Sequence, residues 1–302
     1  MVTFWRHMAR ETESEHRRQH PTQLFGYTVI SRIGRGAGAR IYAVREPVTR
    51  LTFAMKHVTR HKKRDIRYVE QIQNELAMGR LVRHEGIRRP VSIHIKRSLF
   101  RRVKEAALLV EYVEGTRFTD VTEMRVWETL LVFARLARAV GAMHASGILH
   151  CDLKPSNIMI TGDRQPKLID LGQACRIGTT KKRIQGTPGF MSPEQVHRKV
   201  MTVRTDVFGF GASLYWALTG RTIPTAAPSR RKKEFVIGSA IPAPMEINPI
   251  VPQAASELVM ECIRQDEAKR PGSMNDIATR LEQIGREARQ VYEARSQAPK
   301  GE

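Results

Sequence analysis

The chain has 302 residues, of which 41% are hydrophobic, so it can build one large or two smaller folded units and is not disordered throughout. Its three cysteines are far apart and odd in number, which argues against a disulfide framework and excludes a four-thiolate zinc site. The 51 Lys and Arg against 30 Asp and Glu give a formal net charge of +21, which attracts polyanions such as nucleic acid.

The first 26 residues are polar and carry charges of both signs, without the apolar stretch of a signal peptide. No run of about eighteen apolar residues occurs anywhere, so no membrane-spanning helix is predicted. The few scattered cysteines fit a reducing compartment. We therefore expect a flexible polar leader over residues 1–26 and a cytoplasmic protein that does not enter a membrane.

Beyond the leader, alternating apolar residues predict strands over 27–30, 41–44, 51–56, 91–95 and 106–112. Apolar residues near one face predict a helix over 67–83 between them. Later segments are helical in pattern, over 126–146, 206–218, 254–263 and from 277 onward. This order predicts an α+β fold with a small β-rich N-lobe and a larger helical C-lobe.

A glycine-rich stretch reads Ile-Gly-Arg-Gly-Ala-Gly-Ala-Arg-Ile from Ile33 to Ile41. A dinucleotide-binding motif of this type opens a helix, whereas here the following residues alternate like a strand. A glycine-rich hairpin can lie over a polyphosphate because its backbone N–H groups are accessible. A tight turn without a ligand is the competing interpretation.

The next predicted strand ends in Ala54-Met55-Lys56, and its alternation places Lys56 on the same face as Ala54, beneath the glycine hairpin. The helix that follows carries Glu75. A Lys–Glu pair here could align the phosphates of a nucleotide. An incidental ion pair on the protein surface is an equally good interpretation of these two residues.

A polar loop at Asp152, Lys154 and Asn157 lies between two apolar, strand-like segments. Its carboxylate could accept a hydroxyl proton, its amine could stabilise a moving phosphoryl group, and its amide oxygen could bind a metal ion. Asp170 follows in Leu-Ile-Asp-Leu-Gly and adds a metal-binding carboxylate. A coincidental polar loop would seldom show these residue types at these spacings.

Taken in order, these segments resemble a eukaryotic-type (Hanks-type), bacterial-like protein serine/threonine kinase over about residues 27–285. The segments that carry the resemblance are the glycine loop, Ala54-Met55-Lys56, Glu75, His150-Cys151-Asp152, Asp170-Leu171-Gly172, Gly186-Thr187-Pro188, Ser192-Pro193-Glu194, Asp206 to Gly211, and Arg270, which should pair with Glu194. The resemblance implies a bilobal fold, with an N-lobe over 27–113, a C-lobe over 114–285, and a polar tail over 286–302.

The resemblance also implies ATP and Mg²⁺ as cofactors and protein Ser/Thr hydroxyls as acceptors, Lys154 being typical of Ser/Thr kinases. Asp152 would act as catalytic base or orient the hydroxyl, and Lys154 would neutralise the γ-phosphoryl charge. Lys56, held by Glu75, would bind the α- and β-phosphates, and Asn157 and Asp170 would hold Mg²⁺. The nucleotide would contact Ile33, Gly34, Gly36, Ala39, Ile41, Ala54 and Met159 and the backbone of Glu111 and Val113.

Three departures from the family pattern modify these expectations. Cys151 replaces an arginine that usually meets an activation-segment phosphate, so we expect no phosphorylation switch through that contact. Gly79 replaces a bulky apolar residue, and we expect it to leave a gap and weaken its helix. Arg117 and Ser156 stand where arginine-directed kinases carry acidic residues, which predicts protein substrates that are neutral or acidic around the acceptor. Autophosphorylation is a further activity that the resemblance allows.

Three alternatives to a protein kinase remain. A catalytically silent pseudokinase scaffold is disfavoured because the four key polar residues, Lys56, Asp152, Asn157 and Asp170, are all present. A small-molecule kinase would usually lack the segments around Glu194 and Arg270. A basic nucleic-acid-associated regulatory protein would explain the charge, although the basic clusters lack interleaved aromatic residues.

Overall fold

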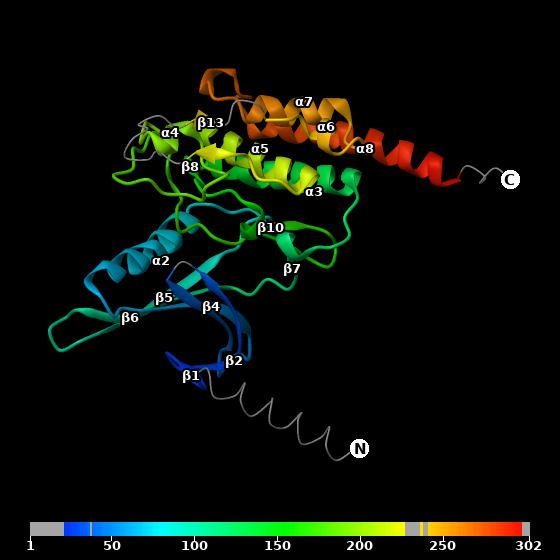
Figure 1. Cartoon of the computed structure of the whole chain (residues 1–302). Coiled ribbons are helices and arrows are strands. Elements are labelled where there is room, and N and C mark those ends of the chain that lie inside the picture. The colour runs from blue at the N-terminus through cyan, green and yellow to red at the C-terminus, as the bar shows by residue number, and fades with distance from the viewer. Residues whose placement is uncertain (1–20, 37, 227–235, 238–240, 298–302) are drawn as a thin grey trace, which may run out of the picture. The chain divides into compact units, whose positions relative to one another are not determined.

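The computed structural model describes residues 21–36, 38–226, 236–237 and 241–297, so most of the expected leader lies outside the described residues. The chain divides into two compact units. The N-terminal unit comprises the residues up to Leu76 together with Pro90–Tyr112, and the C-terminal unit comprises Ala77–Arg89 and the residues from Val113 onward. The labelled strands of the N-terminal unit run from blue to teal in Figure 1.

The N-terminal unit is built on a six-stranded antiparallel sheet with the strand order β1-β2-β3-β4-β6-β5. The strands are β1 (Gln23–Leu24), β2 (Tyr27–Gly36), β3 (Ala39–Arg45), β4 (Thr52–Thr59), β5 (Pro90–Arg97) and β6 (Val103–Glu111). All five predicted strands are therefore confirmed. Strand β1 was not predicted, because two residues are too short to show an alternation.

The two faces of this sheet carry separate apolar clusters because successive side chains of a strand point to opposite sides. On one face, Ala54 and Val58 of β4 pack with Val69 and Ile72 of helix α2 (Ile66–Gly79), which a short 3₁₀ helix η1 (Lys63–Asp65) precedes. On the other face, Met55 packs with residues of β1, β2, β3 and β6. The single main helix thus covers one face of the sheet.

Helix α2 ends at Gly79, so the predicted end near residue 83 is wrong. Gly79 is the last residue of the helix, and its φ does not lie in the left-handed region that a glycine beyond a helix end usually adopts. Gly79 is buried at this terminus. At this last helical position the penalty for a glycine is smaller than in the helix interior, and the gap expected beside Gly79 stays a prediction.

The C-terminal unit is mainly helical. Its helices are α3 (Val126–Ala145), α4 (Pro193–Val196), α5 (Val203–Thr219), α6 (Pro244–Ile247), α7 (Gln253–Cys262) and α8 (Met274–Gln297), with 3₁₀ turns η2 (Phe118–Asp120), η3 (Pro155–Asn157) and η4 (Glu267–Lys269). Short strands pair in the orders β10-β9-β7, β11-β8 and β12-β13. They are β7 (Thr116–Arg117), β8 (Ile148–Leu149), β9 (Ile158–Ile160), β10 (Pro166–Leu168), β11 (Cys175–Arg176), β12 (Thr225–Ala226) and β13 (Val236–Ile237).

The four predicted C-terminal helices correspond to α3, α5, α7 and α8. Helix α8 continues through Gln297, so residues 286–297 of the expected polar tail are helical. The α+β fold, with a β-rich unit that holds one main helix and a larger helical unit, is confirmed. Among the described residues, none of the helices combines the length and hydropathy that a membrane span requires.

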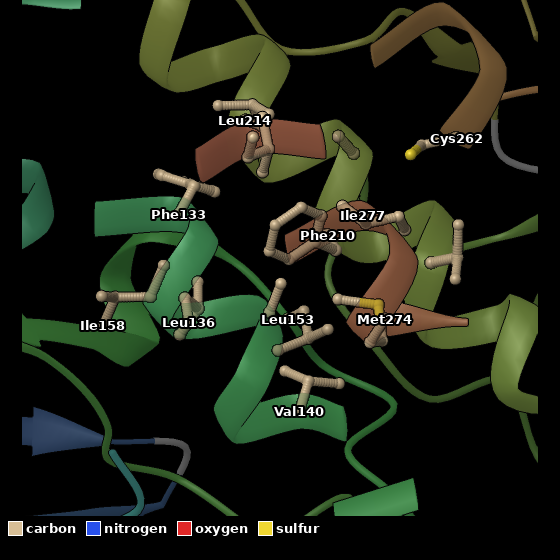
Figure 2. Packing of buried hydrophobic residues seen from close by; sticks show 14 of the residues in the cluster. Phe133, Leu136, Val140, Leu153, Ile158, Phe210, Leu214, Cys262, Met274 and Ile277 are labelled. Atoms are coloured by element: carbon tan, nitrogen blue, oxygen red, sulfur yellow. The ribbon is translucent and has the colours of Figure 1, made fainter. Parts of the chain in front are cut away.

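The core of the C-terminal unit forms where α3, α5 and α8 meet, and Figure 2 shows their side chains converging. Phe133 of α3 and Phe210 of α5 are fully buried, with ring centroids 5.5 Å apart. Burying a phenylalanine of this kind stabilises the fold by about 1.5–3 kcal/mol. Leu153, which follows Asp152, and Ile158, which follows Asn157, enter the same core, so the loop segment with Lys154 and Asn157 is anchored at both ends.

Candidate active site

In the N-terminal unit, Lys56 and Glu75 form a buried ion pair. The Lys56 Nζ lies 2.8 Å from Oε1 and 2.6 Å from Oε2 of Glu75, and the two residues are 6% and 4% exposed. Lys56 faces α2 because it is two residues from Ala54 and two from Val58, both of which pack on that helix. The interpretation as an incidental surface pair is therefore wrong.

The glycine-rich stretch forms the hairpin between β2 and β3, as predicted, with Gly34 opposite Ile41 and Gly36 opposite Ala39. Ala37 lies outside the described residues. Gly38 has φ +71°, and a Cβ added to it would collide with the Tyr68 ring. At Gly36 a Cβ would meet only the end of Ile41, at 3.9 Å. The turn therefore favours glycine at position 38, whereas position 36 has room for a Cβ among the described residues.

The other nucleotide-contacting residues predicted in this unit follow the strand register. Ile41 is opposite Lys56, and Ala54 is opposite Val110 of β6. Ala54 is buried, Ile41 is half-buried and Ile33 is exposed. Glu111 ends β6. The remaining two predicted contacts belong to the C-terminal unit, where Val113 and Met159 of β9 are both half-buried.

In the C-terminal unit, the structure brings Asp152, Lys154 and Asn157 into one hydrogen-bond network. The Thr187 hydroxyl donates to Asp152 Oδ1 at 2.8 Å, and Lys154 Nζ donates to the Thr187 hydroxyl at 2.7 Å. Lys154 Nζ also lies 2.9 Å from Asp152 Oδ2. Asn157 Nδ2 donates to the Asp152 carbonyl at 2.9 Å. A hydroxyl is thus held between a carboxylate and an ammonium group.

The chain around Asp152 is held by Asp206 of α5. Its carboxylate accepts the backbone N–H groups of His150 (2.7 Å) and Cys151 (2.8 Å) and contacts His144 Nε2 at 3.0 Å. Burial alone would raise the pKa of Asp206, but hydrogen bonds and nearby histidines outweigh it and lower the pKa. Helix α5 thus anchors the loop that carries Asp152.

His150 is fully buried, and burial lowers its pKa, so its imidazole is neutral near pH 7. Its Nδ1 accepts the backbone N–H of Asp152 at 3.2 Å. On the other side of the loop, Gln195 Nε2 donates to the Cys151 carbonyl at 2.8 Å. The backbone on both sides of the Asp152 carboxylate is therefore fixed by specific hydrogen bonds.

The predicted pairing of Arg270 with Glu194 is also confirmed. Two parallel hydrogen bonds of 2.8 and 3.0 Å join the buried groups. Arg270 donates further to the carbonyls of Arg264 and Arg204, and its guanidinium lies 5.0 Å from the Phe208 ring centroid. Burial raises the pKa of Glu194, but the bonds from Arg270 outweigh it, so the pKa is lowered. The pair ties α4 to the loop before α8.

The two predicted metal ligands, Asn157 and Asp170, suit a cation that takes most of its ligands from water and from the substrate. Asn157 uses its amide nitrogen on Asp152, so its amide oxygen is the atom that suits a cation. One oxygen of Asp170 accepts the backbone N–H of Gly172 at 3.0 Å. The described part of the chain contains no cluster of three or more His, Cys, Asp or Glu suited to a metal. Mg²⁺ commonly uses one or two protein oxygens together with phosphates and water, so this pair fits it.

Thr187 was missed as a site residue. Its contact with Asp152 spans 35 residues of sequence, and neither periodicity nor local spacing reports a link of that length. The Gly-Thr-Pro sequence around it was the available signal.

Comparison with known proteins places these observations in a family. A model of the protein kinase domain matches residues 27–281. A probable serine/threonine-protein kinase of Clostridium acetobutylicum is 25% identical over 268 residues, which cover 85% of this chain and 40% of the relative. Serine/threonine-protein kinase PknH of Mycobacterium tuberculosis is 28% identical over 278 residues, covering 84% and 41%.

A mouse relative described as an inactive serine/threonine-protein kinase, PLK5, is 28% identical over 246 residues, covering 79% of this chain and 40% of that protein. The chain thus spans about two fifths of the length of these relatives. The family model, in contrast, extends over most of the chain and over both units. The chain belongs to the protein kinase domain family.

Proposed function

We propose that the chain is an ATP-dependent protein serine/threonine kinase, with Asp152 as catalytic base or orienter. The observation that carries this proposal is the contact of the Thr187 hydroxyl with Asp152 and Lys154, at 2.8 and 2.7 Å. A carboxylate that accepts a hydroxyl proton beside an ammonium group is what transfer of a phosphoryl group to a Ser or Thr side chain requires. Other chemistry at a polar loop would not need both groups on one hydroxyl.

In the proposed reaction, the acceptor hydroxyl donates to Asp152, which orients its oxygen toward the γ-phosphorus of ATP. A bond forms between that oxygen and phosphorus, the bond to the β–γ bridging oxygen breaks, and ADP leaves. Lys154 stabilises the charge on the moving phosphoryl group. Mg²⁺, when bound, would neutralise phosphate charge, and Asn157 and Asp170 would hold it. The buried Asp206 would hold the backbone of His150 and Cys151, directly before Asp152, in place throughout.

Most of the proposed nucleotide contacts belong to the N-terminal unit, and only Met159 and Val113 belong to the C-terminal unit. Two carboxylate contacts from Glu75 fix the position of Lys56 Nζ, which suits it to bind the α- and β-phosphates. The hairpin around Gly34 and Gly36 presents backbone without side chains, which lets N–H groups approach the phosphates. Ile33, Ala39, Ile41, Ala54, Met159 and the backbone of Glu111 and Val113 would contact the rest of the nucleotide.

Substrates that are neutral or acidic around the acceptor are also part of this proposal. Arg117 lies in β7 opposite Met159, and Ser156 lies exposed in η3 beside Asn157. Neither position offers a carboxylate to a basic peptide. The exposed Lys182 and Arg183 follow in the segment before Thr187 and would repel such a peptide.

The test is transfer of label from γ-labelled ATP to a generic acceptor protein in the presence of Mg²⁺. Asp152→Asn should lower the rate by about 10²–10⁴-fold, the usual contribution of a positioned acid–base group. Asp163→Asn is the matched control, because Asp163 is an exposed carboxylate of the same unit. An Asp152→Asn variant as active as the wild type, or a folded wild type that transfers no label, would contradict the proposal.

A further inference from the structure

Two of the three cysteines lie together in the C-terminal unit, although 24 residues separate them in sequence. The sulfur atoms of Cys151 and Cys175 are 3.4 Å apart. Strand pairing brings them together, because Cys175 of β11 is opposite Leu149 of β8 and Cys151 follows two residues later. The Cys151 sulfur also lies 3.8 Å from that of Met201. A pair of thiols therefore joins the catalytic loop to the segment that follows Asp170.

The two thiols have different environments. Cys151 is only 3% exposed, whereas Cys175 is half-buried, so solvent has more access to Cys175 than to Cys151. The two sulfurs share a hydrogen bond in which either thiol can be the donor, and this contact together with the nearby Lys181 lowers the pKa of Cys175. The same bond and burial raise the pKa of Cys151. Because Cys175 is the more exposed of the two, we assign it the attack on an oxidant and assign Cys151 the resolving step.

We propose that Cys151 and Cys175 form a peroxide-sensitive dithiol site that closes to an intramolecular disulfide. The Cys175 thiolate attacks one oxygen of hydrogen peroxide, so that an S–O bond forms, the O–O bond breaks, and hydroxide leaves. The Cys151 sulfur then attacks the Cys175 sulfur, an S–S bond forms, and the S–O bond breaks. The two protons released by the thiols convert the two leaving hydroxides into water. The thiols lose two electrons and peroxide gains them, and a dithiol reductant reverses the change.

The structure favours closure without opening of the chain. The sulfurs already lie 3.4 Å apart and must approach to about 2.05 Å to form the bond. The contact exists while Asp152 is hydrogen-bonded to Thr187, so the bond would retain that arrangement. The loop it closes contains Asp152, Asn157 and Asp170. Since such a link restricts the unfolded chain, the oxidised protein should also melt at a higher temperature.

Cys262 is a built-in control for this site. It is fully buried, and burial raises its pKa to about 12, so peroxide should not oxidise it while the protein is folded. We therefore predict that peroxide oxidises Cys151 and Cys175 and leaves Cys262, in the same unit, unchanged.

The experiment treats the full chain with hydrogen peroxide, blocks remaining thiols by alkylation under denaturing conditions, and maps peptides by mass spectrometry without reduction. We expect a crosslink between the peptides of Cys151 and Cys175, reversal by dithiothreitol, and alkylated Cys262. The melting temperature should rise by about 5–10 °C on oxidation. Cys262→Ser should behave like the wild type. Cys151→Ser should leave a sulfenic acid on Cys175 that dimedone traps.

Oxidation of Cys175 without a crosslink to Cys151 in the wild type would overturn the proposal, as would a disulfide that involves Cys262 or a second chain. The wild-type map needs no variant, so failure of a substituted protein to fold would not obscure the result. Neither readout measures phosphoryl transfer. The dithiol site can therefore fail while the proposed kinase activity stands, and the reverse also holds.

Discussion

The buried pair of Arg270 and Glu194 should contribute far more to stability than a surface pair of the same geometry. Both residues are less than 5% exposed, and two hydrogen bonds of 2.8 and 3.0 Å join them. Arg270→Ala would leave the Glu194 carboxylate buried without its partner and would also remove donors to backbone carbonyls. Breaking a buried pair in this way costs about 3–5 kcal/mol. A domain is stable by only about 5–15 kcal/mol, so the loss should be easy to measure.

The chain offers a matched control in Arg138 and Glu282. This pair has the same two-bond geometry, at 2.8 and 2.9 Å, but its side chains are 44% and 28% exposed. Arg138→Ala should therefore cost no more than about 1 kcal/mol, because water screens the charges. The assay is urea unfolding of both variants at pH 7. Equal losses for the two variants would refute the reasoning from burial.

A double substitution completes this test. Arg270→Met combined with Glu194→Leu removes both buried charges, so the double variant should be more stable than Arg270→Ala. The double variant should lose clearly less unfolding free energy than Arg270→Met and Glu194→Leu lose in sum, because the two residues stabilise the fold as a pair. Additive losses would show that the two groups stabilise the fold independently.

Three further predictions concern the hairpin, the buried histidines and the activation segment. Gly38→Ala should lower the unfolding free energy by more than about 1 kcal/mol, because residue 38 has φ +71° and a Cβ there would collide with a tyrosine ring. Gly36→Ala is the control and should leave the unfolding free energy nearly unchanged. Equal shifts in melting temperature for the two variants would contradict this prediction. Burial lowers the pKa of His57 and His150, so the stability they contribute is full above their ordinary pKa of about 6.5 and is lost as the pH falls below it. Urea unfolding should thus show lower stability at pH 5.5 than at pH 7.5, and His57→Gln should reduce that difference; an unchanged difference would exclude His57 as a source. Replacing both Thr179 and Thr180 by alanine should leave kcat for label transfer unchanged, because Cys151 offers no positive charge to a phosphate on either threonine. Complete loss of turnover in a folded variant would contradict this prediction.

The sequence predicted best those features that are local. Asp152, Lys154 and Asn157 lie within six residues, so their chemistry was visible before any fold was known, and the structure joins them in one network. The long strands and helices showed their periodicity. Two-residue strands such as β8 and β11 show none, and they are the strands whose pairing sets two sulfurs in contact.

Contacts across long stretches of sequence were the ones that composition could not predict. The spacing of the cysteines argued against a disulfide framework and gave no sign of a contact, yet β8 and β11 bring two of the sulfurs to 3.4 Å. The contact of Thr187 with Asp152 crosses the whole activation segment. The end of α2 at Gly79 shows the converse case, because apolar periodicity continued past a residue that terminates the helix.

The most direct test of the proposed activity is a single turnover of γ-labelled ATP on a protein acceptor, followed by acid hydrolysis and identification of the labelled amino acid. ATP binding to wild type and to Asp152→Asn is measured in parallel, since the carboxamide should leave binding largely intact. We predict labelled phosphoserine or phosphothreonine with the wild type and almost none with Asp152→Asn. A wild type that binds ATP with Mg²⁺ but labels neither amino acid would contradict the account.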